Sequence, residues 1–373
     1  RCLTSATAGL LSGVLTIAMA CAFSALIFAG PLSGYVSTGI SLILFGAFVL
    51  GTVTALTSSY AGTVARPHEI PAAIVAIIAA SIAGHMTAGA SGAAVFATVL
   101  AAIFIASCAT GILFLLLGYL DLGNLIRFVP YPVIGGFLAG TGLLLVKGAF
   151  GVMTDRALTL ENMTYLASSG LLIKWLPGLV FALVLFFVLR WRNHYLVMPV
   201  WLAISFTLFF AIAHAAGATF GSLRAGGWLI GSIEGSGARD LTLSAVSQVD
   251  WRLVAAQTGK FLTILILSCI SLLLNASGLE IVVKEDIDLN RELRATGFAN
   301  LLSGFTGSTV GFHSLSLSAL GYSMGAKSRM VGVISAFLCG SIVVFGSSLL
   351  AYFPRPIMGG VLLILLRFTS PTV

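Results

Sequence analysis

Three long stretches without a charged residue constrain this chain more than any other feature of its sequence. No Asp, Glu, Lys or Arg occurs in residues 2–65, 70–120 or 193–223, which are 64, 51 and 31 residues long. A helix of about 20 residues crosses the hydrocarbon core of a bilayer, so these stretches have room for about two, two and one such helices. With 58% hydrophobic and 8% charged residues, the composition excludes a water-soluble globule. The sequence predicts an all-α polytopic membrane protein in a lipid bilayer.

Apolar length and helix-breaking residues predict twelve membrane helices along the chain. The predicted helices cover residues 9–29, 35–56, 71–86, 93–119, 130–149, 174–190, 196–216, 258–280, 294–306, 312–325, 329–351 and 355–367.

The basic residues indicate an orientation. The 19 Lys and Arg exceed the 12 Asp and Glu, which in a soluble chain would suggest nucleic acid. Here the basic residues mostly flank apolar runs, so we expect no nucleic-acid partner. A cytoplasmic N-terminus places eleven of the 19 basic residues inside and eight outside, and this bias favours a multi-pass protein in that orientation.

Two of the predicted helices, those that open at Pro71 and Phe312, are short and follow polar or glycine-rich segments (TVARPHEI and SGFTGSTVG). An unpaired backbone group facing lipid costs several kcal/mol, so these segments must line a cavity or be buried in protein. A pair of interrupted helices in the two halves of a chain indicates the binding site of an inverted-repeat transporter. The other interpretation is that both are kinked packing helices.

A repeated motif supports an internal repeat that relates the two halves of the chain. Residues 128–138 (FVPYPVIGGFL) and 352–362 (YFPRPIMGGVL) share Pro-x-Pro, two aliphatic residues, Gly-Gly, one residue and Leu. The match is either an internal repeat or a coincidence between two helix starts, where Pro and small residues are common. If it is a repeat, the fifth helix corresponds to the twelfth, and two closing helices are missing from the second repeat.

The sequence resembles the SulP family of inorganic anion permeases. The resemblance is carried by residues 127–145 (RFVPYPVIGGFLAGTGLLL), by 288–308 (DLNRELRATGFANLLSGFTGS) and by the helix start at Pro354 and Pro356. It implies a uracil-permease-like seven-plus-seven inverted repeat, here truncated after about twelve spans. The chain starts at an Arg without an initiator Met, and we expect a membrane core taken from a longer protein.

The resemblance also implies a division into two domains and an assembly. The core domain comprises residues 1–119 (spans 1–4) and 258–351 (spans 8–11). The gate domain comprises residues 120–257 (spans 5–7 and an outer loop) and, incomplete, 352–373. A cytoplasmic regulatory domain on the full-length chain and a homodimer formed through regions partly missing here are further implications.

In such proteins the third and tenth spans are half-helices whose N-termini meet near mid-membrane. Each N-terminus presents unpaired amides and about half a positive charge, so the pair forms an anion site without a lysine. In this chain the amides would be those near 71–73 and 311–314. The substrate-binding residues expected on this basis are Phe23, Glu69, Pro71, Ala72, Ala73, Asn275, Gly311, Phe312, His313 and Ser314.

The chain departs from the family where polar groups are usual. Ala18 and Met19 replace Pro-Gln in the first span, Asn275 replaces an acid in the eighth, and Leu317 replaces an Arg in the tenth. Each change removes polarity or charge from the expected pocket. The resemblance therefore does not imply that this chain is specific for sulfate or bicarbonate.

Charged and titratable groups near the pocket have more than one interpretation. Glu69 is either an N-terminal cap or the counter-charge for a cation, a proton or a basic amino acid. His313 either hydrogen-bonds in the site, titrates with coupled protons, or is satisfied by helix-end carbonyls. His68 and Glu280 are further coupling candidates, and the 275–300 region also resembles a SulP-like branch that handles basic amino acids.

Two further patterns bear on function. The charged run 284–294 is expected to be a solvated cytoplasmic connector or a docking site for the missing domain.

His313 and Ser314 are adjacent, point about 100 degrees apart on a helix and lie in no nucleophile turn, so we expect no enzyme and no catalytic residues. No phosphate-binding loop or metal-ligand spacing occurs, so we expect no cofactor and no metal, with Na⁺ or H⁺ as the possible coupling ion.

These observations predict a secondary active transporter that moves a small inorganic or organic anion by an elevator-type mechanism, either by symport or by antiport. One alternative keeps the fold and transports a basic or zwitterionic amino acid, with Glu69 and Glu280 as counter-charges. A second alternative is a regulated channel or a membrane sensor.

Overall fold

The computed structural model describes residues 2–28, 30–86, 91–123, 131–154, 168–191, 197–229, 247–345, 352–364 and 366. The first half of the chain contains α1 (Cys2–Ile27), the 3-10 helix η1 (Gly30–Tyr35), α2 (Val36–Thr57), β1 (Ala65–Pro67), α3 (Glu69–Met86), α4 (Gly92–Tyr119), α5 (Tyr131–Thr154), α6 (Ser169–Trp191) and α7 (Val197–Ala215). The second half contains α8 (Phe220–Ala225), α9 (Trp251–Ala255), α10 (Thr258–Val283), α11 (Leu289–Gly304), β2 (Gly311–His313), α12 (Leu315–Ser323), α13 (Met330–Phe345) and α14 (Arg355–Ile364).

Each of the twelve predicted helices has a counterpart in the structure. The helices α8 and α9 were not predicted, because six and five residues are too few for an apolar period to appear. Six described helices are long and apolar enough to cross a membrane, and these lie within 3–27, 31–57, 69–86, 92–119, 170–191 and 258–283. The fold is thus a bundle of apolar helices, as the charge-free stretches indicated.

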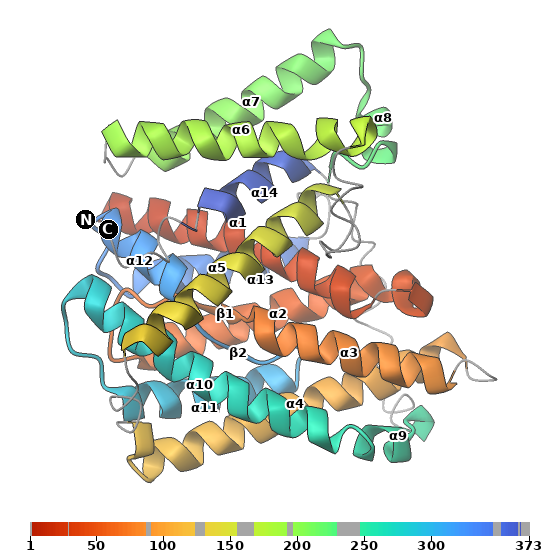
Figure 1. The fold of residues 1–373 in the computed structure, drawn as a ribbon, viewed down its shortest axis with the longest axis vertical. Coiled ribbons are helices and arrows are strands. Elements are labelled where there is room, and N and C mark those ends of the chain that lie inside the picture. Colours follow the sequence, from red (N-terminus) through yellow and green to blue (C-terminus); the bar gives the residue numbers. More distant parts are fainter. Residues whose placement is uncertain are drawn as a thin grey trace.

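The helices pack in two groups, which Figure 1 shows in one view. The helices α5, α6 and α7 pack with α14, and α6 and α7 form the upper edge of the view. The helices α1 to α4 pack with α10 to α13. The first helix, α1, also contacts α5 and α14, so it lies at the boundary of the two groups.

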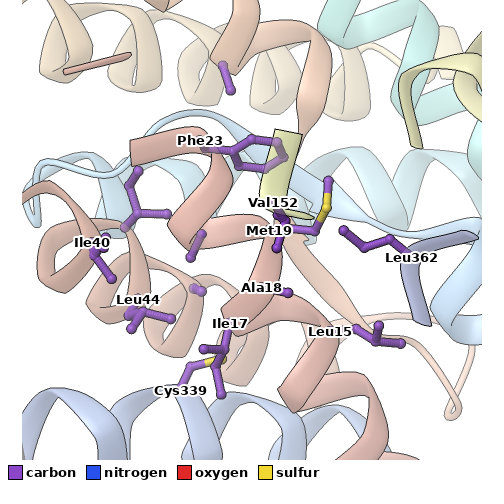
Figure 2. Packing of buried hydrophobic residues seen from close by; sticks show 14 of the residues in the cluster. Leu15, Ile17, Ala18, Met19, Phe23, Ile40, Leu44, Val152, Cys339 and Leu362 are labelled. Atoms are coloured by element: carbon purple, nitrogen blue, oxygen red, sulfur yellow. The ribbon is translucent and has the colours of Figure 1, made fainter. Parts of the chain in front are cut away.

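An apolar core lies along α1. Figure 2 shows Met19 and Phe23 of α1 gathered with Val152 of α5 and Leu362 of α14. On another side, α1 packs against α2 and α13, and Ile17 lies beside Cys339 of α13 (Figure 2). The contact between the two helix groups therefore includes Met19, Phe23, Val152 and Leu362, each at most 9% exposed.

The packing repeats between the two halves of the chain. The helix α4 packs along α11, and α13 packs along α2, as a repeat that relates α4 to α13 and α11 to α2 requires. The α4–α11 contact is close enough that a Cβ added at Gly111 would lie 2.8 Å from the carbonyl oxygen of Gly297. The helices α5 and α14 each begin at the middle residue of a Pro-x-Pro motif, Tyr131 and Arg355.

The two interrupted segments meet in the middle of the molecule (Figure 1). The strand β1 pairs antiparallel with β2, so that Ala65 faces His313, Arg66 faces Phe312 and Pro67 faces Gly311. The sequence predicted a break before each short helix but no strand, because three residues are too few for an alternating pattern to appear. As a result α3 begins at Glu69 rather than Pro71, and α12 begins at Leu315 rather than Phe312.

Candidate functional site

The β1–β2 ribbon brings the N-termini of α3 and α12 together. We call this meeting point of the two strands and the two helix starts the crossing. Each strand runs almost directly into a helix, β1 into α3 and β2 into α12. Because the strands are antiparallel, the two helices leave the ribbon in opposite directions and both direct their N-terminal ends at it. Both strands are buried along their whole length. The crossing therefore concentrates two positive helix ends inside the protein.

The amides available to a solute differ from those expected from the sequence. The expected donors near residues 311–314 are partly used in the ribbon, since the Gly311 amide donates to Asn300 Oδ1 (3.0 Å) and the Ser314 amide donates to the Val64 carbonyl (2.8 Å). The first turn of α12 starts at Leu315, whose amide lies 3.3 Å from Asn275 Oδ1. In α3, the Ala72 amide donates to the His68 carbonyl (3.2 Å). The Gly311 and Ser314 amides, two of the predicted donors, are therefore already paired within the protein.

Helix geometry identifies the donors that remain. The first three residues of an α-helix have no carbonyl partner within the helix. For α3 these are Glu69, Ile70 and Pro71, and Pro71 has no N–H, which leaves two amides. For α12 they are 315–317, of which the first meets Asn275. Each helix therefore brings about two amides to the crossing.

A buried ion pair lies on one face of the ribbon. Glu69 accepts a hydrogen bond from Arg66 Nη2, and its other carboxylate oxygen lies 2.8 Å from His68 Nδ1. Arg66 also donates to the Pro67 carbonyl (3.0 Å). The Arg66 and Glu69 charges cancel, although both side chains are at most 6% exposed.

An aromatic contact across the crossing joins the two halves. The rings of His68 and Phe312 stack with centroids 3.9 Å apart and an interplanar angle of 13°. This contact places His68, from the α3 side, directly against the strand that leads to α12. Three residues expected in the site, His68, Glu69 and Phe312, are therefore brought together.

A second buried acid, Glu292 of α11, lies beneath the crossing. Its Oε1 accepts from Ser58 Oγ (2.9 Å), Ser59 Oγ (2.7 Å) and the Ser59 amide (2.6 Å). Its Oε2 lies 3.7 Å from His313 Nδ1. The prediction that the run 284–294 is a solvated connector is wrong here, because α11 begins at Leu289 and Glu292 is 1% exposed. Sequence reasoning missed Glu292 because dense charge around it resembled a loop.

Two asparagines fix the second strand and its helix. Asn300 Nδ2 donates to the carbonyls of Gly311 (2.7 Å) and Thr296 (2.9 Å), while Asn300 Oδ1 accepts from the Gly311 amide. Asn275 Nδ2 donates to the Ser271 carbonyl (2.8 Å), which orients its Oδ1 toward α12. Asn275, expected in the site, therefore lies at the first turn of α12.

The remaining expected residues have different surroundings. Pro71 and Ala72 are buried and Ala73 is half-buried in α3. Phe23 packs in the apolar core at the boundary of the two helix groups. Glu280 Oε1 accepts from the Ile287 amide (3.0 Å), which places this carboxylate at the turn between α10 and α11.

Several buried polar atoms around the crossing meet no hydrogen-bond partner among the described residues. They include Nε2 of His68, Oε2 of Glu292 and both ring nitrogens of His313. Buried polar groups are normally paired, so such a cluster indicates a place for a bound molecule, a proton or water. Within the same described ranges, no group of three or more His, Cys, Asp or Glu side chains is placed to hold a metal ion.

Comparison with known proteins identifies the family and the fold. The model of the sulfate permease family matches residues 4–368. The chain is 28% identical over 271 residues to the vacuolar basic amino acid transporter VSB1 of Saccharomyces cerevisiae, covering 70% of this chain and 26% of VSB1. It is 25% identical over 387 residues to the bicarbonate transporter BicA of Picosynechococcus sp., covering 95% of this chain and 59% of BicA. The chain thus spans less than two thirds of either relative.

Solved structures share the fold. The transmembrane domain of a cyanobacterial bicarbonate transporter, BicA, matches with a TM-score of 0.61 and 21% identity over 98% of this chain and 88% of that one. SLC26A9 matches with a TM-score of 0.66 and 16% identity over 99% of this chain and 58% of that one. These likenesses show the inverted-repeat fold. Together with the family match over nearly all its length, they show that the chain is a multi-pass membrane protein that belongs to the sulfate permease family.

Proposed function

We propose that the chain is the membrane part of a secondary active transporter that carries a small anion bound between the N-termini of α3 and α12. The observation that supports this most directly is the β1–β2 pairing, which brings both helix starts to one buried crossing. Each helix end contributes about half a positive charge and about two amides. An anion held there needs no dedicated lysine.

The side-chain charges on this face of the ribbon are compatible with an anion. Arg66 and Glu69 neutralise each other, and the Glu69 carboxylate already lies at the first turn of α3. The first turn of α12 contains no acid. An anion is therefore expected closer to α12, where Ser314 and Asn275 are the neighbouring polar side chains.

The proposed transport motion follows from the two helix groups. A core domain of residues 1–119 and 258–351 would carry the site past a gate domain of residues 120–257 and 352–373. Apolar side chains such as Met19, Phe23 and Leu362 line the contact along α1, and apolar surfaces can slide without breaking hydrogen bonds. We also propose a cytoplasmic N-terminus, a homodimer and a cytoplasmic regulatory domain on the full-length protein.

A second candidate, transport of a basic or zwitterionic amino acid, is favoured by one observation. Glu69 is a buried carboxylate at the crossing, held by Arg66 and His68. If a cationic substrate took the place of Arg66 beside Glu69, the same geometry would bind the opposite charge. The name of the relative VSB1 is in line with this candidate. Glu280, at the α10–α11 turn, would act only as a secondary counter-charge.

A flux panel separates the two candidates. Full-length protein in liposomes is tested for uptake of labelled sulfate, bicarbonate and arginine. Anion transport predicts uptake of sulfate or bicarbonate that unlabelled arginine does not inhibit. Uptake of arginine alone would refute the anion and establish the second candidate.

Paired variants of α3 test the position of the site. Ala72→Leu adds bulk at a buried residue in the first turn of α3, whereas Ala80→Leu adds the same bulk at an exposed residue of the same helix. We expect Ala72→Leu to abolish uptake of the transported ion and Ala80→Leu to leave it unchanged, with both proteins inserted in the membrane. Equal uptake by the two variants would place the solute elsewhere.

A further inference from the structure

The pair formed by Glu292 and His313 lies on the other face of the ribbon from the Arg66–Glu69 ion pair. Successive residues of a strand point to opposite faces, so His313 points away from the face that carries Phe312 and its partner His68. Both members of the pair are 1% exposed. The pair is therefore separate from the Arg66–Glu69 ion pair and from the His68–Phe312 contact.

The surroundings of Glu292 hold its carboxylate in place. Three donors from Ser58 and Ser59 converge on Oε1. Its Oε2 has no hydrogen-bond partner in the described part of the chain, nor has Nδ1 of His313, 3.7 Å away. That distance is too long for a hydrogen bond.

A proton on His313 completes this arrangement. An N⁺–H···O⁻ bond measures about 2.7–2.9 Å, so closing the gap requires a movement of about 1 Å. The imidazolium would then be paired with Glu292. In the neutral ring with its hydrogen on Nε2, a buried carboxylate oxygen and a buried ring nitrogen face each other unpaired.

We propose that Glu292 and His313 form a proton-binding site that is coupled to solute binding at α12. His313 takes up a proton at Nδ1 from water on the side to which the site is open, and the Glu292 carboxylate stabilises the resulting positive charge. His313 directly precedes Ser314, the residue at the N-cap of α12. Its charge therefore adds to the positive end of that helix, so the proton and an anion strengthen each other's binding.

The direction of coupling rests on the proposed anion site, whereas the proton site itself does not. With an anion the linkage gives proton symport. With a cation the same charge would repel the substrate and give antiport. The sign of the coupling thus reports the sign of the substrate.

Other titratable groups lie on the elements around the pair. Arg66, His68 and Glu69 lie on the opposite face of the ribbon. Tyr60, Cys269 and Tyr322 belong to the apolar cluster that also contains Phe312, and Asp288 and Arg291 lie at the start of α11, bonded to Ser59 and Thr57. Arg66 and Glu69 are already paired with each other.

Calorimetry on the full-length protein measures the coupled proton. Sodium sulfate is titrated in two buffers with different ionisation enthalpies, which gives the number of protons taken up per sulfate. We expect about one proton for the natural protein and close to none for Glu292→Gln and His313→Gln. In both variants, the change of sulfate affinity with pH should be about ten-fold smaller than in the natural protein. Unchanged proton uptake in both variants would overturn the proposal.

Two control variants match the chemistry outside the site. Glu285→Gln removes a half-exposed acid that pairs with Lys327, and His85→Gln removes an exposed histidine of α3. Both are expected to keep the proton uptake of the natural protein. If Glu292→Gln does not fold, His313→Gln decides alone, because it leaves the three donors on Glu292 in place.

An infrared titration keeps the proton site testable if sulfate does not bind. Absence of sulfate binding would count against sulfate as the transported anion but not against the proton site. The carboxylate and imidazole bands are then followed between about pH 5 and pH 8. We expect a pH-dependent difference that disappears in both variants. A difference spectrum that neither variant changes would refute the pair as a proton site.

Discussion

Asn300 should contribute strongly to the stability of the protein by holding the crossing together, although it lies outside the proposed solute site. Its side chain pairs with both the amide and the carbonyl of Gly311, as a neighbouring strand would. Asn300→Ala leaves these two buried backbone groups unpaired. An unsatisfied buried group costs about 1–3 kcal/mol, so the free energy of unfolding should fall by roughly 2–6 kcal/mol.

Denaturant titration of the purified protein in mild detergent measures this loss as a lower midpoint with an unchanged slope. Asn290→Ala is the matched control, because Asn290 Oδ1 accepts a single backbone bond, from the Gly123 amide (2.7 Å). It should lose about half as much, roughly 1–3 kcal/mol. Asn300→Asp keeps the acceptor for Gly311 but places an acceptor against two carbonyls, and it should destabilise at least as much as Asn300→Ala. An Asn300→Ala protein as stable as Asn290→Ala would refute the reasoning.

Substitutions at three further contacts are tested by the same titration. Arg66→Gln leaves the buried Glu69 carboxylate without its cation and should cost about 3–5 kcal/mol, and adding Glu69→Gln should recover part of that loss; no recovery would contradict the ion pair. Gly297→Ala places a Cβ 2.8 Å from the Gly111 carbonyl oxygen and should cost about 1–3 kcal/mol. Arg329→Ala removes donors to the carbonyls of residues 55, 56 and 58 at the end of α2, and it should lower the free energy of unfolding by about 1–2 kcal/mol. An unchanged midpoint would show that water replaces the guanidinium.

The Gly111–Gly297 contact illustrates what a membrane-helix sequence leaves open. Among 42 glycines, nothing local distinguishes these two from the many that merely allow helices to approach. Their role appears only when α4 and α11 are placed side by side, where each glycine lies against the other's carbonyl.

The sequence by itself determined the helices and the two breaks. Residues without charge over such lengths have no stable place except in a bilayer, and a helix is the conformation that pairs its own backbone there. That is why the twelve predicted helices were found. Pro71 and the glycines before Phe312 likewise predicted interruptions, because those residues weaken a continuous helix wherever it lies.

Only the tertiary structure decided which groups meet at the crossing. The Val64 amide bonds to Ser318 Oγ, 254 residues away along the chain, and Glu292 is held by serines from the other half of the chain. Strands of three residues have no pattern of their own, and a charge in a polar run looks solvated until a partner covers it. Burial, pairing and the facing of His313 toward Glu292 are properties of two distant segments together, so neither segment alone encodes them.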